Sequence, residues 1–261
     1  MNVPIFRVDA FTDRAFGGNP AAVCLLDAWL PPGSMQVLAE ENRMPATAFV
    51  VPEGNHYRLR WFTPRVEEEL CGHGTVAAAH VVHTVLRPGC GDILFESPAG
   101  PLPVAVRDGR YTIDVPARKP VACSPPPALL EALGAPPAEV LAAASYIAIY
   151  ETADIVERLT PDLQALSSLD LPGVVVSAPG RDCDIESRYF APAKGIPEDP
   201  VTGSAHAQLL PYWAERLGRG TLDARQLSER GGRMTCELRG DRALLTGAAV
   251  TTMRGETAVP S

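Results

Sequence analysis

Arg60-Trp61-Phe62-Thr63-Pro64 runs into Cys71-Gly72-His73-Gly74-Thr75, and a similar pattern returns as Arg188-Tyr189-Phe190-Ala191-Pro192 running into Asp199-Pro200-Val201-Thr202-Gly203-Ser204-Ala205-His206. Each copy is typical of a strand, a loop stopped by proline, and a glycine-rich turn that opens a helix of small residues. One copy in each half of the chain predicts an internal duplication. Each half should then present a helix N-terminus, where unpaired N–H groups favour an anion.

The segments around the two copies follow a similar order. In the first half we expect helices at Pro32–Asn42 and Gly72–Leu86, and strands at Phe6–Phe11, Ala21–Leu26, Thr47–Pro52, Tyr57–Phe62, Ile93–Glu96, Leu102–Val106 and Arg110–Val115. In the second half we expect helices at Pro127–Leu133, Pro161–Ser168 and Gly203–Leu217, and strands at Tyr146–Tyr150, Gly173–Ala178, Ile185–Phe190, Met234–Leu238 and Ala243–Ala249. The helix at 72–86 is apolar nearly all round, which predicts that a sheet wraps it.

A proline-rich segment separates the halves. Residues 116–127 contain five prolines and little apolar periodicity, as a linker does. We therefore expect an N-terminal lobe at 1–117 and a C-terminal lobe at 118–261. The pattern leaves open that the last strand packs back on the N-terminal lobe.

Composition restricts the class of partner. The chain has 261 residues, 46% of them hydrophobic and 21% charged, with a formal net charge of −8. An acidic chain without clustered Lys and Arg argues against nucleic acid or an anionic membrane as partner. No long apolar run is present, so we expect no membrane span and a cytoplasmic protein. The six cysteines have no C-x-x-C spacing, which predicts neither a disulfide framework nor a metal site.

Three side chains near the two turns could move a proton. His73 lies in the first turn of its helix, where we expect a near-neutral pKa and proton transfer at physiological pH. Cys71 precedes that helix, whose N-terminus would favour a thiolate. Asp199 precedes the second turn, and its simplest interpretation is a helix cap. Gly72, Gly74 and Gly203 would let a ligand approach the backbone closely.

These motifs, together with Val8-Asp9-Ala10-Phe11-Thr12 and Phe16-Gly17-Gly18-Asn19-Pro20-Ala21, resemble the PhzF phenazine-biosynthesis family over nearly the whole chain. The resemblance implies the diaminopimelate epimerase fold. That fold is α+β, with two similar lobes related by a pseudo-two-fold axis, each a curled antiparallel sheet wrapped around a central helix. It further implies an active site in the cleft between the lobes.

The resemblance also implies a function. Members are isomerases or epimerases that need no cofactor or metal, transfer a proton on a small carboxylate such as an amino acid or an anthranilate-like molecule, and often form homodimers. By position, His73 and Asp199 match catalytic residues, with Cys71 as a further candidate. The substrate-binding residues would be Asn19, Gly72, Gly74, Thr75, Gly203 and Ser204.

One catalytic position departs from the family pattern. Members carry a glutamate acid/base within Asn-Leu-Ser-Glu-Thr-Ala-Phe, whereas this chain has Ala46 at that place, within Arg43-Met44-Pro45-Ala46-Thr47-Ala48-Phe49. A methyl group transfers no proton. Asp199, His73 or Cys71 could take over, or the substrate could need only one protein group. The alternative is a catalytically impaired protein that binds a small carboxylate, and a metal-dependent enzyme is a distant third.

Overall fold

The computed structural model describes residues 1–259. The chain divides into two compact units. Unit 1 comprises Met1–Asp114 together with the chain from Thr246 onward, and unit 2 comprises Val115–Leu245. The division after Asp114 lies close to the boundary expected after residue 117. The second lobe was expected at 118–261, with the option that the last strand packs back on the first lobe. Residues from Thr246 onward group with unit 1.

Unit 1 is built on a sheet that closes on itself. Its strands run in the order β1-β2-β3-β4-β6-β7-β8-β16, and β1 also pairs with β16. The strands are β1 Asn2–Ala10, β2 Asn19–Leu25, β3 Ala46–Glu53, β4 His56–Phe62, β5 Glu67–Glu68, β6 Ile93–Ser97, β7 Gly100–Arg107, β8 Arg110–Pro116 and β16 Arg242–Ala258. Closure removes the open edges that a curled sheet would otherwise have.

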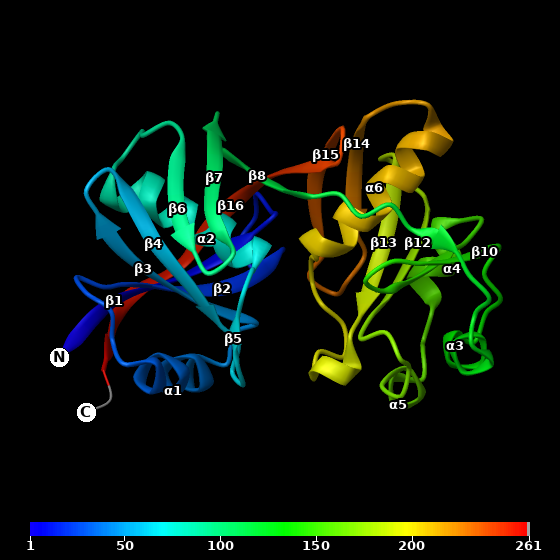
Figure 1. The fold of residues 1–261 in the computed structure, drawn as a ribbon, viewed down its shortest axis with the longest axis horizontal. Helices are drawn as coiled ribbons and strands as arrows, with labels where there is room; N and C mark the ends of the chain where they lie inside the picture. The colour runs from blue at the N-terminus through cyan, green and yellow to red at the C-terminus, as the bar shows by residue number, and fades with distance from the viewer. Residues whose placement is uncertain (260–261) are drawn as a thin grey trace. The chain divides into compact units, whose positions relative to one another are not determined.

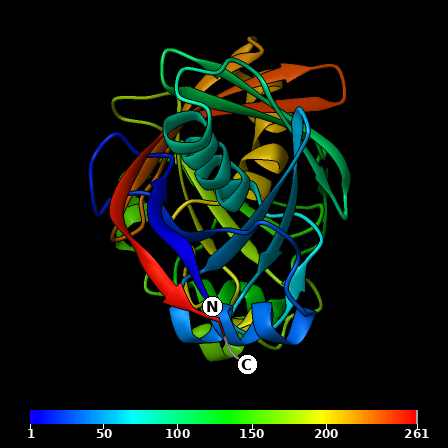
Figure 2. The same ribbon diagram turned by 90° about the vertical axis from the view of Figure 1, so that its left-hand side faces the viewer.

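The closed sheet surrounds helix α2, Gly72–Val81, which continues as the π-helical turn η1, Val82–Leu86 (Figures 1 and 2). Ala and Val dominate α2, and the residues from Gly74 to Ala79 are all buried. Small side chains on every face let strands approach the helix from all sides. Helix α1, Pro32–Asn42, instead covers the outer face, where Met35 and Leu38 join a cluster with Phe49 and Phe62.

Unit 2 repeats this plan with an open sheet. Its strand order is β16-β15-β14-β13-β12-β11-β10-β9, and helix α6, Gly203–Leu217, packs against β14 and β15 (Figure 1). The strands are β9 Val121–Ala122, β10 Glu139–Ala142, β11 Tyr146–Ile149, β12 Val174–Pro179, β13 Ile185–Phe190, β14 Thr221–Gln226 and β15 Gly232–Arg239. The other helices are α3 Pro127–Leu133, α4 Ala153–Arg158, α5 Leu163–Leu166 and the 3₁₀ turn η2 Pro192–Lys194.

The two units share one connection pattern, which supports the duplication. In unit 1, β4 leads through α2 to β6, and these two strands pair in parallel. In unit 2, β13 leads through α6 to β14, again a parallel pair. A helical crossover returns the chain in the same direction, so both sheets contain parallel pairs within a mostly antiparallel order.

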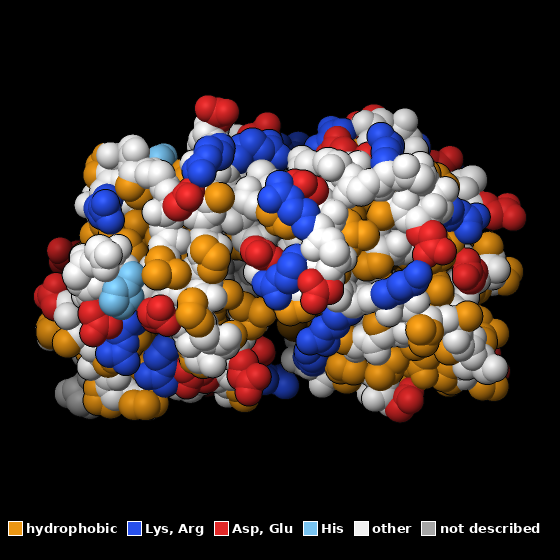
Figure 3. All heavy atoms as spheres, turned by 45° about the horizontal axis from the view of Figure 1, so that its top comes forward, with side chains coloured by type: hydrophobic (Ala, Val, Ile, Leu, Met, Phe, Trp, Pro, Cys, Tyr) orange, Lys and Arg blue, Asp and Glu red, His pale blue; other side chains and the backbone are white. Residues whose placement is uncertain are grey.

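The surface carries charges of both signs. Figure 3 shows basic and acidic side chains interspersed on one face, often in contact. Exposed ion pairs of the described residues include Arg107 with Asp92 and Lys119 with Glu215. Within residues 1–259, every helix is too short or too polar to cross a bilayer.

Candidate active site

Helix α2 begins at Gly72, and the residue before it, Cys71, has an extended backbone with φ −134° and ψ 105°. The first N–H groups of a helix lack partners within it, and with the helix dipole they favour an anion. The N–H and the hydroxyl of Thr75 both donate to the Cys71 carbonyl oxygen, at 2.9 and 2.7 Å. The hydroxyl proton of Thr75, an expected substrate-binding residue, therefore closes the first helical turn.

The thiol of Cys71 lies beside the imidazole of His73, with Sγ 3.6 Å from Nδ1. Burial lowers the pKa of His73 to about 4, so the ring is neutral at physiological pH. The expectation of near-neutral titration is wrong because the imidazole is desolvated. A neutral imidazole has one donor and one acceptor nitrogen. His73 therefore suits hydrogen bonding to the thiol or to a substrate better than storage of a proton.

Trp61 packs against the same turn. A Cβ atom on Gly74 would lie 2.8 Å from Trp61 Cδ1 and 3.0 Å from Cys71 Sγ, so only glycine fits at position 74 without displacing a neighbour. The indole Nε1 of Trp61 is buried and finds no hydrogen-bond partner within residues 1–259. Our sequence reasoning did not assign Trp61 to the site, although the duplicated pattern contains it.

Ala46 lies on the inner face of the unit 1 sheet. It is the first residue of β3 and pairs in parallel with Ala21 of β2, two residues after Asn19. Side chains alternate along a strand, so Ala46 shares a face with Ala48, and Ala48 lies opposite Trp61. Asn19 and Ala46 thus occupy the same end of neighbouring strands, on the sheet that surrounds α2, and both are buried.

Asp199 lies between β13 and α6. Its N–H donates to the Tyr189 carbonyl at 2.9 Å, and its Oδ2 accepts a hydrogen bond from Thr202 Oγ1 at 2.5 Å. The residue before α6 is Thr202, with an extended backbone of φ −119° and ψ 103°. The simple interpretation of Asp199 as the capping residue is therefore wrong, because Thr202 holds that position. Ser204, in the first turn of α6, is exposed.

The two helix starts have matching surroundings. Cys71 and Thr202 occupy the same capping position, each followed by a glycine. A Cβ on Gly72 would lie 3.2 Å from Ile113 Cδ1, and a Cβ on Gly203 would lie 3.3 Å from Leu245 Cδ1. In both units, then, the first residue of the central helix abuts an aliphatic side chain of a strand. The two helix starts therefore have the same backbone conformation but different side chains at the capping position, Cys71 and Thr202.

His206, in the first turns of α6, has a structural role. Its Nδ1 lies 2.8 Å from the Thr202 carbonyl oxygen, and its Nε2 lies 3.5 Å from Ser187 Oγ. A carbonyl only accepts, so Nδ1 carries the proton. Burial lowers the pKa of His206, so the ring is neutral. His206 thus holds the start of α6.

Potential metal ligands cluster elsewhere. Among residues 1–259, ligand atoms of Asp182, Cys183 and Glu186 lie within 4.8 Å of one another. Arg181 Nε lies 2.9 Å from Glu186 Oε2, and Arg225 Nη1 lies 3.7 Å from an oxygen of both Asp182 and Glu186. Burial raises the pKa of Cys183 to about 11, which keeps the thiol protonated. Guanidinium groups thus compensate the carboxylates, so this cluster is an ion-pair network.

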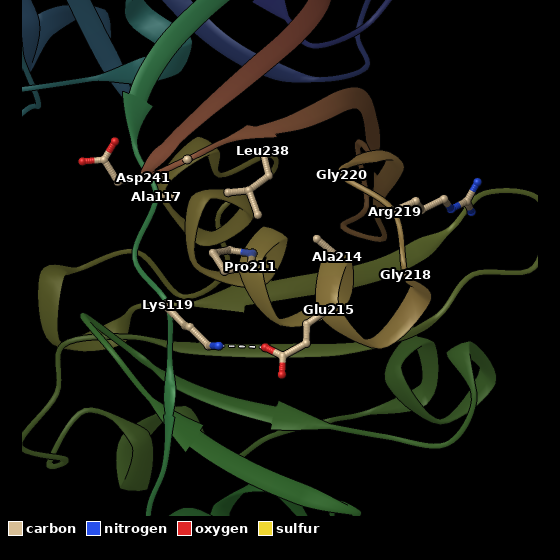
Figure 4. A pocket seen from close by; sticks show the side chains of 11 residues that line it. Ala117, Lys119, Pro211, Ala214, Glu215, Gly218, Arg219, Gly220, Leu238 and Asp241 are labelled. Atoms are coloured by element: carbon tan, nitrogen blue, oxygen red, sulfur yellow. Dashed lines mark hydrogen bonds and ion pairs between the residues drawn. The ribbon is translucent and has the colours of Figure 1, made fainter.

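Unit 2 also contains a hollow of about 640 Å³. Figure 4 shows it beside the second half of α6, with Pro211 and Ala214 on its wall and Lys119 Nζ reaching Glu215 Oε2 at 2.7 Å. None of the expected site residues lines it. The sequence-predicted residues lie in or just before the first turns of α2 and α6 and at the starts of β2 and β3.

Comparison with known proteins agrees with these features. The sequence model of the family described as "Phenazine biosynthesis-like protein" matches residues 8–255. An uncharacterized isomerase of Pseudomonas aeruginosa is 46% identical over 255 residues, which cover 98% of each chain. The crystal structure of a PhzF family protein from Enterococcus faecalis has a TM-score of 0.96 at 42% identity, covering 99% of this chain and all of that one.

More distant structures share the fold. A hydroxyproline epimerase from Agrobacterium vitis has a TM-score of 0.66 at 11% identity, covering 98% of this chain and 92% of that one. Likeness at that level shows the fold alone. The expected α+β fold of epimerase-like lobes is thereby confirmed. With most of its length matched by the family model and by close relatives, the chain belongs to the phenazine biosynthesis-like PhzF family of isomerases.

Proposed function

We propose that this protein is an isomerase or epimerase that moves a proton on a small carboxylate without a metal or organic cofactor. The observation that carries the proposal is the thiol–imidazole contact at the start of α2, Cys71 Sγ to His73 Nδ1 at 3.6 Å. A helix N-terminus stabilises a thiolate. Cys71 is thus the group of unit 1 best suited to exchange a proton in place of the glutamate missing at Ala46.

In this proposal, each unit contributes one proton-transfer group. Cys71 serves from unit 1, with His73 as a neutral hydrogen-bonding partner, and Asp199 serves from unit 2. The carboxylate of the substrate binds N–H groups at a helix start. The proposed substrate-binding residues are Asn19, Gly72, Gly74, Thr75, Gly203 and Ser204. Amino acids and anthranilate-like acids are the substrate classes to test first. A homodimer is the expected assembly.

Carbon–hydrogen exchange tests the reaction directly. The protein is incubated in D₂O with a panel of amino, imino and cyclic unsaturated acids, and deuterium incorporation is followed by proton NMR. Exchange at one carbon that persists in EDTA supports the proposal. Asp199→Asn should slow this exchange by about 10² to 10⁴-fold. An Asp199→Asn variant that exchanges at the unaltered rate would refute the assigned role.

Ala46 favours a second candidate, a protein that binds a small carboxylate without turning it over. The side chain is a buried methyl group on the inner sheet face, where the family pattern has the proton carrier. In that case no acid of the panel exchanges, although calorimetry detects binding of one of them. Ala46→Glu should then create exchange while leaving affinity nearly unchanged. Turnover by the unaltered protein would exclude this candidate.

A further inference from the structure

Gln226 makes three hydrogen bonds to the segment that carries Asp199. It is the last residue of β14 and is buried. Its Nε2 donates to the Asp199 carbonyl oxygen at 2.6 Å and to Thr202 Oγ1 at 3.2 Å. Its Oε1 accepts the N–H of Thr202 at 2.8 Å. One side-chain amide therefore joins both ends of the turn before α6.

The partners fix which way the amide faces. The Thr202 N–H can only donate, so the atom facing it must be the amide oxygen. The Asp199 carbonyl can only accept, so the atom facing it must be the amide nitrogen. Both requirements agree on one orientation, and the 180° flip would break both contacts. Gln226 is therefore held in a single hydrogen-bonding state.

That orientation sets the direction of the next hydrogen bond. Thr202 Oγ1 accepts from Gln226 Nε2, so its own proton is directed to Asp199 Oδ2, 2.5 Å away. Thr202 is also held through its carbonyl by His206 Nδ1 at 2.8 Å. Every polar group of Thr202 thus has a buried partner, and its hydroxyl can serve Asp199 only as a donor.

We propose that Gln226 is a positioning residue that acts through Thr202 to orient the Asp199 carboxylate and to favour its ionised form. A hydroxyl that donates to a carboxylate stabilises the charged state. This inference rests on the proposed role of Asp199 in proton transfer and adds what prepares that group. Nothing in the sequence pattern connects Gln226 to the site, because it lies 24 residues beyond Thr202 on a separate strand.

Other ionisable groups surround Asp199 and bear on the test. Tyr189 of β13 has a pKa raised by burial and, to a smaller extent, by the charge of Asp199. His206 of α6 is neutral, because burial lowers its pKa. Glu198, the residue before Asp199, accepts a hydrogen bond from Arg188 Nε at 2.7 Å. The variants proposed below leave Tyr189, His206 and Glu198 in place, so we expect a shift in titration to report on the Gln226–Thr202 connection.

The test combines titration and kinetics on the full chain. In the unaltered protein labelled with ¹³C-aspartate, the Asp199 carboxyl resonance is assigned by its loss in Asp199→Asn and is titrated by NMR. Thr202→Val and Gln226→Leu should both move the midpoint to higher pH, and Thr202→Ser should restore it. With an exchanging substrate, both variants should lower kcat by about tenfold, as expected for loss of one buried hydrogen bond, with KM nearly unchanged.

Ser177→Ala is the matched control, since Ser177 is a buried hydroxyl of unit 2 that binds Trp213 Nε1 and the Glu186 carbonyl, away from Asp199. It should reduce thermal stability without moving the Asp199 midpoint. The titration needs no substrate, so it judges this inference even if no acid exchanges and the proposed function fails. The inference would be overturned if the Asp199 titration midpoint, and the low-pH side of the kcat–pH profile, stayed unchanged in both Thr202→Val and Gln226→Leu.

Discussion

Arg188 and Glu198 form a two-armed ion pair, with Nε 2.7 Å from Oε1 and Nη2 2.9 Å from Oε2. Arg60 and Glu67 form its counterpart in unit 1, at 2.6 and 2.7 Å. Each arginine opens one copy of the duplicated pattern. Glu67 lies in strand β5 and Glu198 in the loop after η2, and each of these segments leads to a central helix. The two arginines thus hold in place the chain segments that lead to Cys71 and Asp199.

Arg188→Met should destabilise the protein more than Arg60→Met. Arg188 is largely buried, and its Nη1 also donates to the carbonyl oxygens of Val156 and Leu159 at 3.1 and 2.7 Å. Loss of these bonds leaves a partly buried Glu198 without its partner, at a cost of about 3 kcal/mol in the free energy of unfolding. Urea denaturation measures the change.

Arg107→Met provides the control, because the Arg107–Asp92 pair is exposed. Solvent screens an exposed pair, so its loss should change the free energy of unfolding little. Equal losses for Arg188→Met and Arg107→Met would contradict the importance of the loop pair.

Cys71→Ser should lower the exchange rate by about 10²-fold or more, because a hydroxyl is a far weaker acid than a thiol at this position. Cys90→Ser is a close control, since Cys90 Sγ also lies near an imidazole, 3.9 Å from His83 Nδ1, but does not precede a helix. It should keep the unaltered rate. Similar rates for both variants would remove Cys71 from the mechanism.

Gly74→Ala should destabilise the protein by about 1 to 3 kcal/mol, because the new methyl group would press on Trp61 Cδ1 and Cys71 Sγ. Gly33→Ala in α1 meets nothing within 4 Å and should be neutral or slightly stabilising. Thermal unfolding compares the two. If the Gly74 variant is as stable as the Gly33 variant, the contact between Trp61 and the first turn of α2 is not tight.

Stability should fall as the pH is lowered from about 6.5 toward 4. Burial lowers the pKa of His73 and of His80 from 6.5 to about 4. Below pH 6.5 the unfolded chain binds protons at these rings while the folded chain does not, so acid favours unfolding. Their stabilising effect is complete above pH 6.5.

Urea denaturation at pH 7.5, 6.0 and 5.0 measures this loss above the range where most carboxylates titrate. Each such histidine contributes a slope of up to about 1.4 kcal/mol per pH unit. His80→Gln should flatten the dependence, because its amide does not titrate. An equally steep dependence in that variant would show that His80 is not the source.

Helix ranges were predicted best where proline or glycine marks a helix end. Prolines open α1 and α3, and glycines close α3 and α6, so the ranges 32–42, 127–133 and 203–217 are as expected. β14, Thr-Leu-Asp-Ala-Arg-Gln, was missed because only two of its six residues, Leu222 and Ala224, are apolar, which is too few to mark a strand by alternation. Short strands such as β10 offer still less pattern.

The site shows the same division. Local motifs predicted the two helix starts. They did not predict Gln226, whose contact with Asp199 depends on strand β14 lying beside β13. Nor did they predict the low pKa of His73, because desolvation depends on atoms brought together by the fold. Site features that depend on residues adjacent in sequence could be predicted, whereas features that depend on packing between distant segments could not.

The long strand β16 has a consequence for synthesis on the ribosome. Unit 1 closes only when β1 pairs with β16, with Asn2 opposite Ala258, whereas unit 2 is one continuous stretch. The segment that contains β1 must therefore wait for the synthesis of residues up to Ala258 before its ring of strands is complete. Unit 2 has no such delay, so we expect it to reach its native structure first.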